Sequence, residues 1–126
     1  TIIQNLEDFG RMPEDYNRII TGDLGYVGQS ILFDLMRGKE WDIKKNHMDC
    51  GMQIFDEESQ DTHAGGSGCA CSALMLSAVI LPKLASGEWK RVLFVPTGAL
   101  LSQVSANEGR TIPAIAHAVW LESGRE

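Results

Sequence analysis

A glycine-rich turn is the part of this sequence whose residue types most directly suggest chemistry. It runs from Gly65 to Cys69, places three glycines within four positions, and leads directly into an apolar stretch. Glycines let the backbone bend sharply and expose its N–H groups. Free N–H groups at a helix start, aided by the helix dipole, can hold an anion. The turn therefore predicts either an anion site or close packing of a helix onto a sheet, and both interpretations stay open at this point.

The cysteines and histidines around this turn could also form a nucleophile or a metal site. Cys69 has His63 six positions before it, and a histidine can serve as the base that forms a thiolate. A structural role for the cysteine is the preferred interpretation. A zinc site could be imagined from His47, Cys50, His63, Cys69 and Cys71. Only one residue separates Cys69 from Cys71, however, which is poor spacing for structural zinc. We expect no catalytic residue, no metal and no cofactor.

Length and composition indicate one globular domain. The 126 residues are 44% hydrophobic and 22% charged, which allows a real core. The net charge of -6 argues against a nucleic-acid partner. Three cysteines, an odd number, favour a reduced intracellular setting, and the apolar stretch 69–81 is too short to span a bilayer. Because the first residue is Thr1, we expect a piece of a longer protein.

The elements that must position the turn alternate between strands and helices. In chain order the sequence predicts helical turns at 5–9, a strand at 15–21, a helix at 24–36, a strand at 48–55, a helix at 69–85, a strand at 91–96, a long loop at 97–110 and a strand at 114–122. Pro82 is expected to kink the second helix, and Gly87 to end it. The uninterrupted apolar strand 91–96 is expected to be central, and His117 to be a core histidine.

This order, β-α-β-α-β-β, predicts an α/β fold with a layered mixed sheet and helices packed on it. The last two strands can pair antiparallel. Ligands in such folds sit beyond the carboxyl ends of the strands. The turns at 21–23 and 65–68 would lie at that edge.

Several long strings in the sequence resemble the stage V sporulation protein AD family. They include Thr21-Gly22-Asp23-Leu24-Gly25, His47-Met48-Asp49-Cys50-Gly51 and Gly65-Gly66-Ser67-Gly68-Cys69, within the stretches 16–25, 47–51, 62–73, 87–93, 96–102 and 112–119. The resemblance covers nearly the whole chain. It implies a thiolase-like fold built from two similar halves, of which residues 1–126 would be a single domain, the C-terminal half.

The resemblance also implies a binding function. Members of the family bind dipicolinic acid and support its uptake into the developing spore, together with other proteins of the same operon at the inner spore membrane. We accordingly expect a spore-forming bacterium, a homodimer, and attachment to the membrane only through partners. The ligand is a flat dianion with two carboxylates, which suits a cradle of N–H, hydroxyl and imidazole donors. The expected ligand-binding residues are His63, Gly66, Ser67, Gly68 and Cys69.

The alternative is an acyl-transferring or condensing enzyme of the thiolase and ketoacyl synthase III superfamily. Such synthases carry a His-Gln-Ala-Asn string after the first strand of this half and a Gly-Asn-Thr string before its second helix. That His and Asn polarise a carbonyl during condensation. Here Thr21-Gly22-Asp23-Leu24 and Gly66-Ser67-Gly68 stand in those places, so both groups are missing. A third interpretation also stays open, in which this half mediates dimerisation and partner docking while the other half holds the ligand.

Overall fold

A four-stranded mixed sheet forms the centre of this computed structural model, which describes residues 1–99, 102–112 and 114–124. The strand order is β2-β1-β3-β4. β2 and β3 run parallel to β1, and β4 runs antiparallel to β3. The strands are β1 (Arg18–Thr21), β2 (His47–Asp49), β3 (Arg91–Val95) and β4 (Val119–Glu122). The predicted α/β fold, its mixed sheet and its antiparallel last pair are confirmed.

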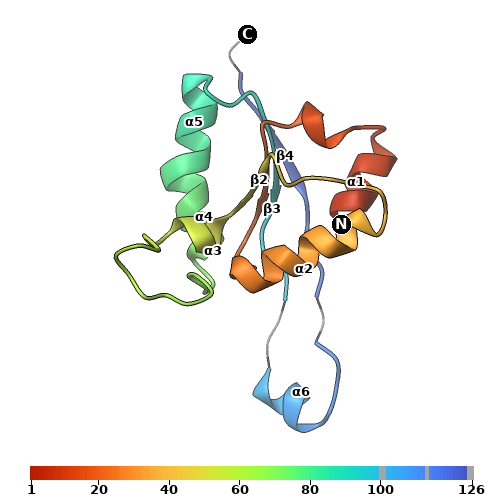
Figure 1. The fold of residues 1–126 in the computed structure, drawn as a ribbon, viewed down its shortest axis with the longest axis vertical. Helices are drawn as coiled ribbons and strands as arrows, with labels where there is room; N and C mark the ends of the chain where they lie inside the picture. Colours follow the sequence, from red (N-terminus) through yellow and green to blue (C-terminus); the bar gives the residue numbers. More distant parts are fainter. Residues whose placement is uncertain (100–101, 113, 125–126) are drawn as a thin grey trace.

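Helices cover both faces of this sheet (Figure 1). One face carries α1 (Ile2–Asp8) and α2 (Gly25–Arg37), and the short helix η1 (Pro13–Asp15) precedes β1. The other face carries α4 (Cys71–Met75), the π turn η2 (Leu76–Ile80) and α5 (Leu81–Ser86), which continue one another. Two further short helices are α3 (Cys50–Gln53), which follows β2, and α6 (Gln103–Asn107), which lies on an excursion that extends away from the sheet (Figure 1).

The inner residues of the central strands are apolar because helices bury both faces of the sheet there. Ile19 and Ile20 of β1 are fully buried, and so are Val92 and Leu93 of β3. Side chains that alternate along each strand enter two separate cores. The core under α4 and α5 contains Ile20, Cys71, Met75, Ile80, Leu84, Trp89, Val92 and Phe94. The core under α1 and α2 contains Ile2, Leu6, Tyr16, Ile19, Met36, Ile43, Leu93 and Val95.

The helix after the glycine turn begins at Cys71, two residues later than predicted. Pro82 has no N–H to donate to Ala78, which interrupts the α-helical hydrogen bonds. The chain responds with the π turn just before it, in which Leu81 N–H donates to the carbonyl of Leu76. The helix then continues to Ser86 and ends at Gly87, which adopts a left-handed φ of 79°.

Four sequence-based expectations were wrong in detail. The strand predicted at 48–55 stops at Asp49, because the Gly51 backbone bonds to the loops at Gly22 and Gly66 and not to a neighbouring strand. The loop predicted at 97–110 contains α6, which Ser102 caps by accepting a hydrogen bond from Ser105 N–H. The last strand covers only 119–122, and His117 before it is exposed, so it is no core histidine.

Candidate functional site

A hydrogen-bonded cluster at the carboxyl ends of β1 and β3 joins three loops through the carboxylate of Asp23. We call this cluster of Asp23, Ser67, Gly68 and Thr97 the Asp23 brace. Asp23 Oδ2 accepts hydrogen bonds from Ser67 Oγ at 2.6 Å and from Gly68 N at 3.3 Å. Asp23 Oδ1 accepts a hydrogen bond from the Thr97 hydroxyl, whose oxygen accepts one from Asp23 N at 3.2 Å. The glycine turn is thereby attached to the loops that follow two adjacent parallel strands, at the edge where such folds bind ligands.

The donors of this brace favour the ionised form of Asp23. Partial burial acts to raise the pKa of the carboxyl group. The hydrogen bonds from Ser67, Thr97 and Gly68 outweigh this effect and leave the pKa below its ordinary value. The glycine turn therefore already holds a carboxylate, and that carboxylate belongs to the protein itself.

The structure brings Ser67 and Gly68 together at the brace but leaves Gly66 and His63 in other surroundings. Gly66 is buried, and its N–H donates to the carbonyl of Gly51 at 2.6 Å. This N–H supports the turn and is not free to bind a ligand. His63 is exposed and has a left-handed φ of 51°, and its Nδ1 lies 2.6 Å from Asp61 Oδ1.

The free backbone donors of the turn lie one step further along the chain. Cys69 and Ala70 are exposed, and their N–H groups donate to no acceptor within the described residues. They directly precede the first residue of α4, Cys71. Together with the Ser67 hydroxyl and the Gly68 N–H, they are the donors that an anion arriving at the turn could use.

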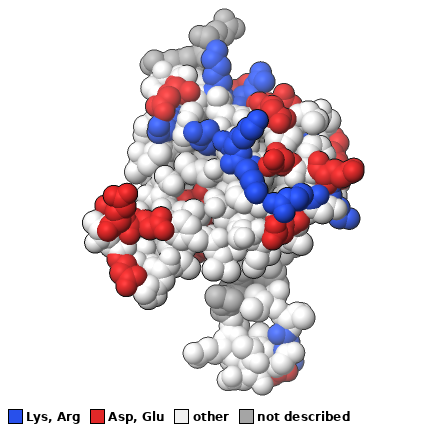
Figure 2. Space-filling view, viewed as in Figure 1, with Lys and Arg blue, Asp and Glu red and all other residues white. Residues whose placement is uncertain are grey.

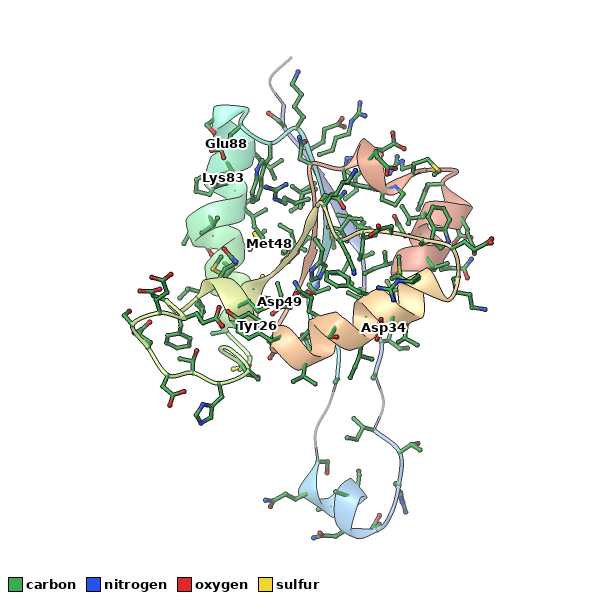
Figure 3. All side chains as sticks on the ribbon, viewed as in Figure 1. Tyr26, Asp34, Met48, Asp49, Lys83 and Glu88 are labelled. Atoms are coloured by element: carbon green, nitrogen blue, oxygen red, sulfur yellow. The ribbon has the colours of Figure 1, made fainter. Side chains whose placement is uncertain are left out.

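A second polar network, which sequence reasoning missed, lies at the ends of β1 and β2. Asp49 is buried at the end of β2, beside the first turn of α2 (Figure 3). Its Oδ2 accepts from Thr21 Oγ1 at 2.6 Å and from Leu24 N at 2.9 Å, and its Oδ1 accepts from Gly25 N at 3.1 Å. A negative charge at the start of a helix is favourable, so Asp49 anchors α2.

His47 extends this network toward α2. Its Nε2 lies 3.0 Å from Thr21 Oγ1, and its Nδ1 lies 3.0 Å from Gln29 Nε2. Burial lowers the pKa of His47 to about 4, although the nearby Asp49 acts in the opposite direction. The ring is therefore neutral at pH 7. Since Thr21 donates to Asp49, His47 Nε2–H donates to Thr21, and Nδ1 accepts from Gln29.

The three cysteines divide into one exposed and two buried thiols. Cys69 is exposed, whereas Cys50 and Cys71 are buried. Burial raises the pKa of Cys50 to about 12 and also raises the pKa of Cys71, so both stay protonated at neutral pH. Within the described ranges, no three His, Cys, Asp or Glu side chains are grouped so that they could hold a metal ion.

We expect one of the three thiols to react rapidly with a thiol reagent such as 5,5′-dithiobis(2-nitrobenzoic acid) in the folded protein. The fast thiol should be Cys69, because burial and protonation protect the other two. Cys69→Ser should abolish the fast phase and leave the slow reaction of Cys50 and Cys71, which full unfolding in urea should accelerate. A fast phase that survives Cys69→Ser would contradict this burial pattern.

An apolar cavity of about 430 Å³ adjoins the brace at the same edge of the sheet. Thr21 and Gly22 from the end of β1 and Thr97 and Gly98 after β3 form one wall. The other walls come from α1, α2 and the segment around Ile115. In the part of the chain that the structure describes, no helix is both long and apolar enough to cross a membrane.

Comparison with known proteins gives two matches. Residues 1–122 match the family described as stage V sporulation protein AD (SpoVAD). The stage V sporulation protein AD of Bacillus subtilis (strain 168) is 43% identical over 122 residues, which are 97% of this chain and 36% of that protein. The chain thus spans about a third of the length of this relative.

Proposed function

Because this chain belongs to the stage V sporulation protein AD family, and so to the sporulation proteins of a spore-forming bacterium, we propose that it takes part in binding dipicolinic acid and in its uptake into the developing spore. The observation that carries the proposal is the carboxylate of Asp23 bound by Ser67 and Gly68. Donors that hold one carboxylate in place are suited to hold another of the same geometry.

We propose that a carboxylate of the ligand takes the place of the Asp23 side chain on the turn. It would accept hydrogen bonds from the Ser67 hydroxyl and from the N–H groups of Gly68 and Cys69. His63, on the exposed side of the same turn, would approach the second carboxylate once it leaves Asp61. The exchange releases Asp23 toward solvent, so the ligand competes with a group of the protein itself and its affinity depends on that competition.

We further propose that the chain is the C-terminal half of a thiolase-like protein with two similar halves. The outward face of the helix from Cys71 to Ser86 supports this proposal, because it is apolar where a solvent-facing helix would carry charges. Leu74 is 52% exposed and Leu81 is 47% exposed. Their neighbours on the same face are Ala73, Ser77, Ala78, Pro82 and Ala85, all exposed. A second half would cover this face. Dimer formation, the operon partners and peripheral placement at the inner spore membrane belong to the same proposal.

The binding site can be tested by calorimetric titration of the full-length protein with dipicolinate. Ser67→Ala should weaken binding by up to about 10-fold, because the ligand loses a hydrogen bond to a charged group that is worth about 1.5–3 kcal/mol, while Asp23 loses the same donor in the free protein and so offsets part of this effect. Asp23→Asn should tighten binding, because it removes the competing charge. Ser30→Ala and Asp34→Asn, at exposed positions of α2, are the matched controls and should bind as the unmodified protein does.

The outcomes separate the site from the function. If the unmodified protein binds dipicolinate but neither Ser67→Ala nor Asp23→Asn changes the affinity, the ligand lies elsewhere and the turn is structural. If the unmodified full-length protein shows no saturable binding, the function itself is refuted. If Asp23→Asn weakens binding as strongly as Ser67→Ala, the proposed exchange of carboxylates is wrong.

A further inference from the structure

A basic cleft opens near the start of β1, at the opposite end of that strand from the Asp23 brace. Its volume is about 330 Å³. Three cations from separate elements line it: Arg18 on β1, Lys45 in the loop before β2, and Lys83 on α5. Figure 2 shows Lys and Arg side chains gathered across the upper middle of this face. We call this feature the basic cleft.

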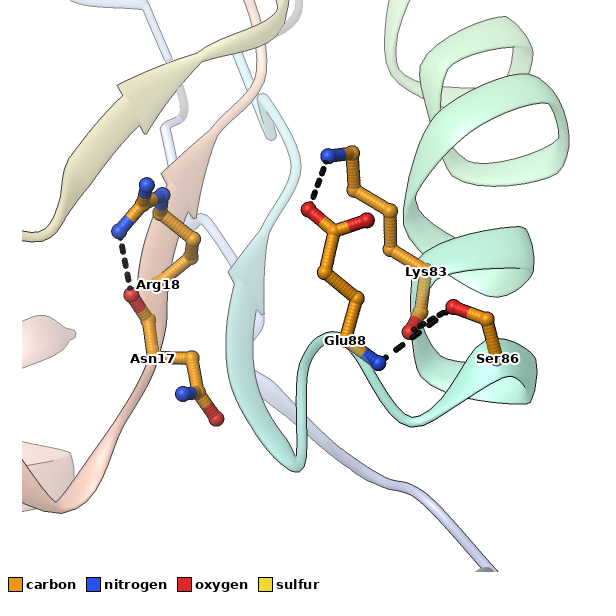
Figure 4. A network of polar contacts seen from close by, with 5 residues as sticks. All are labelled: Asn17, Arg18, Lys83, Ser86 and Glu88. Atoms are coloured by element: carbon orange, nitrogen blue, oxygen red, sulfur yellow. Dashed lines mark hydrogen bonds and ion pairs between the residues drawn. The ribbon is translucent and has the colours of Figure 1, made fainter.

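The positive charge of the basic cleft is only partly neutralised. Lys83 forms an ion pair with Glu88 (Figure 4). Within the described residues, neither Arg18 nor Lys45 lies in an ion pair with a carboxylate. Arg18 instead donates from Nη1 to the carbonyl of Asn17 at 2.8 Å. This excess of cations stands out in a chain whose net charge is -6.

The indole ring of Trp89 lines the basic cleft and lies beside two of its cations. Trp89 is 6% exposed and lies in the core under α5. The Arg18 guanidinium carbon is 5.6 Å from the centre of the indole ring, and Lys83 Nζ is 5.0 Å from it. Cations at this distance from an indole face are attracted to it. Trp89 therefore holds two of the three cations at the cleft before any ligand arrives, which lowers the entropic cost of binding.

The remaining polar groups of the cleft add no charge. His47 also lines it, but both of its ring nitrogens are occupied by Thr21 and Gln29. Gln53 lies at the exposed rim and offers an amide that can donate a hydrogen bond. The cleft thus presents three cations and one amide, with Glu88 the carboxylate paired to Lys83.

We propose that the basic cleft binds a phosphate group, either of a small free molecule or of a lipid headgroup. An arginine can contact two oxygens of one phosphate through its planar fork, and two lysines can neutralise the others as point charges. A site lined by three cations, two of which have no carboxylate partner among the described residues, suits a ligand with several charged oxygens on one atom. The basic cleft shares no residue with the Asp23 brace or the glycine turn, so this inference stands apart from the proposed function.

The test is a calorimetric titration of the full-length protein with inorganic phosphate at constant ionic strength. The double variant Arg18→Gln/Lys45→Gln should weaken phosphate binding by at least about 10-fold. The matched control, Arg37→Gln/Lys39→Gln, removes the same two charge types at exposed positions and should change the affinity by less than about 2-fold. The single variant Lys45→Gln changes an exposed residue, so we expect it to fold normally. It should also weaken phosphate binding, which shows that the effect of the double variant does not come from misfolding.

A second measurement separates the two sources of phosphate. If the ligand is a lipid headgroup, the protein should sediment with phosphatidylglycerol vesicles more than with phosphatidylcholine vesicles. The double variant Arg18→Gln/Lys45→Gln should abolish this co-sedimentation. Phosphate binding without sedimentation assigns the cleft to a free molecule. The inference is overturned if the unmodified protein binds neither phosphate nor vesicles, or if both double variants lose binding equally. Dipicolinate affinity should be unchanged in Arg18→Gln/Lys45→Gln, which keeps the two sites distinguishable.

Discussion

Gly51→Ala is expected to lower the free energy of unfolding by about 3 kcal/mol or more. A Cβ atom at Gly51 would lie 2.2 Å from the carbonyl oxygen of Gly66 and 3.2 Å from the Cα of Asp23. Both neighbours are backbone atoms, so no side-chain rotation can make room. The change would push the glycine turn away from α3 and break the hydrogen bond from Gly66 N to Gly51 O.

Gly38→Ala is the matched control for this prediction. Gly38 ends α2 with a φ of −62°, which any residue adopts, and a Cβ there would meet its nearest neighbour, the carbonyl oxygen of Asp34, at an ordinary 3.5 Å. We expect a change within about 1 kcal/mol. Urea unfolding followed by circular dichroism would measure both variants. Equal stability of the two variants would rule out the close approach of the turn to Gly51.

The free energy of unfolding is expected to fall as the pH decreases from about 6.5 to about 4. Burial lowers the pKa of His47 from its ordinary 6.5 to about 4 in the folded protein. Between these values the unfolded chain binds a proton at His47 that the folded protein does not, so acid favours unfolding. The contribution is fully present above pH 6.5. It falls by up to about 1.4 kcal/mol per pH unit and is lost by about pH 4.

His47→Gln removes this titrating group and should flatten the decline in that pH window. His63→Gln and His117→Gln, at exposed positions, are the controls and should retain the full decline. Urea unfolding at pH 7, 5.5 and 4.5 would measure all three variants. Asp23 acts at lower pH, since its depressed pKa makes its stabilisation disappear below its ordinary value of 3.8. An unchanged slope in His47→Gln would assign the acid sensitivity to other groups.

The fold was predictable from sequence wherever burial produces a long apolar pattern. β3 is buried on both faces, and its uninterrupted apolar run predicted a central strand. The amphipathic spacing at 24–36 predicted α2 nearly to its ends. The strand that ends at Asp49 was predicted too long, because its end depends on backbone hydrogen bonds between Gly51 and distant loops. Ser102, a good N-cap residue, was a local signal for the start of α6. The polar residues around it obscured this signal.

The candidate site was only partly predictable, because its main contact is tertiary. The glycine turn was identified from its residue types. Its carboxylate partner, Asp23, was not identified from the sequence, because Asp23 lies 44 positions from Ser67 and 74 positions from Thr97. No spacing rule links residues at such separations. The pKa of His47 was equally hidden, since its main cause is burial of the ring beside β1, which no local sequence pattern reveals.

The short outer strands of the sheet have a consequence for how this chain meets other proteins. β2 has three residues and turns at once into α3, and β4 has four residues at the other edge. An edge this short offers few unpaired backbone groups, so it is a poor template for a strand from another molecule. Aggregation by strand addition is thereby limited. We therefore expect a partner to pack against the exposed apolar face of the helix from Cys71 to Ser86 and not to extend the sheet.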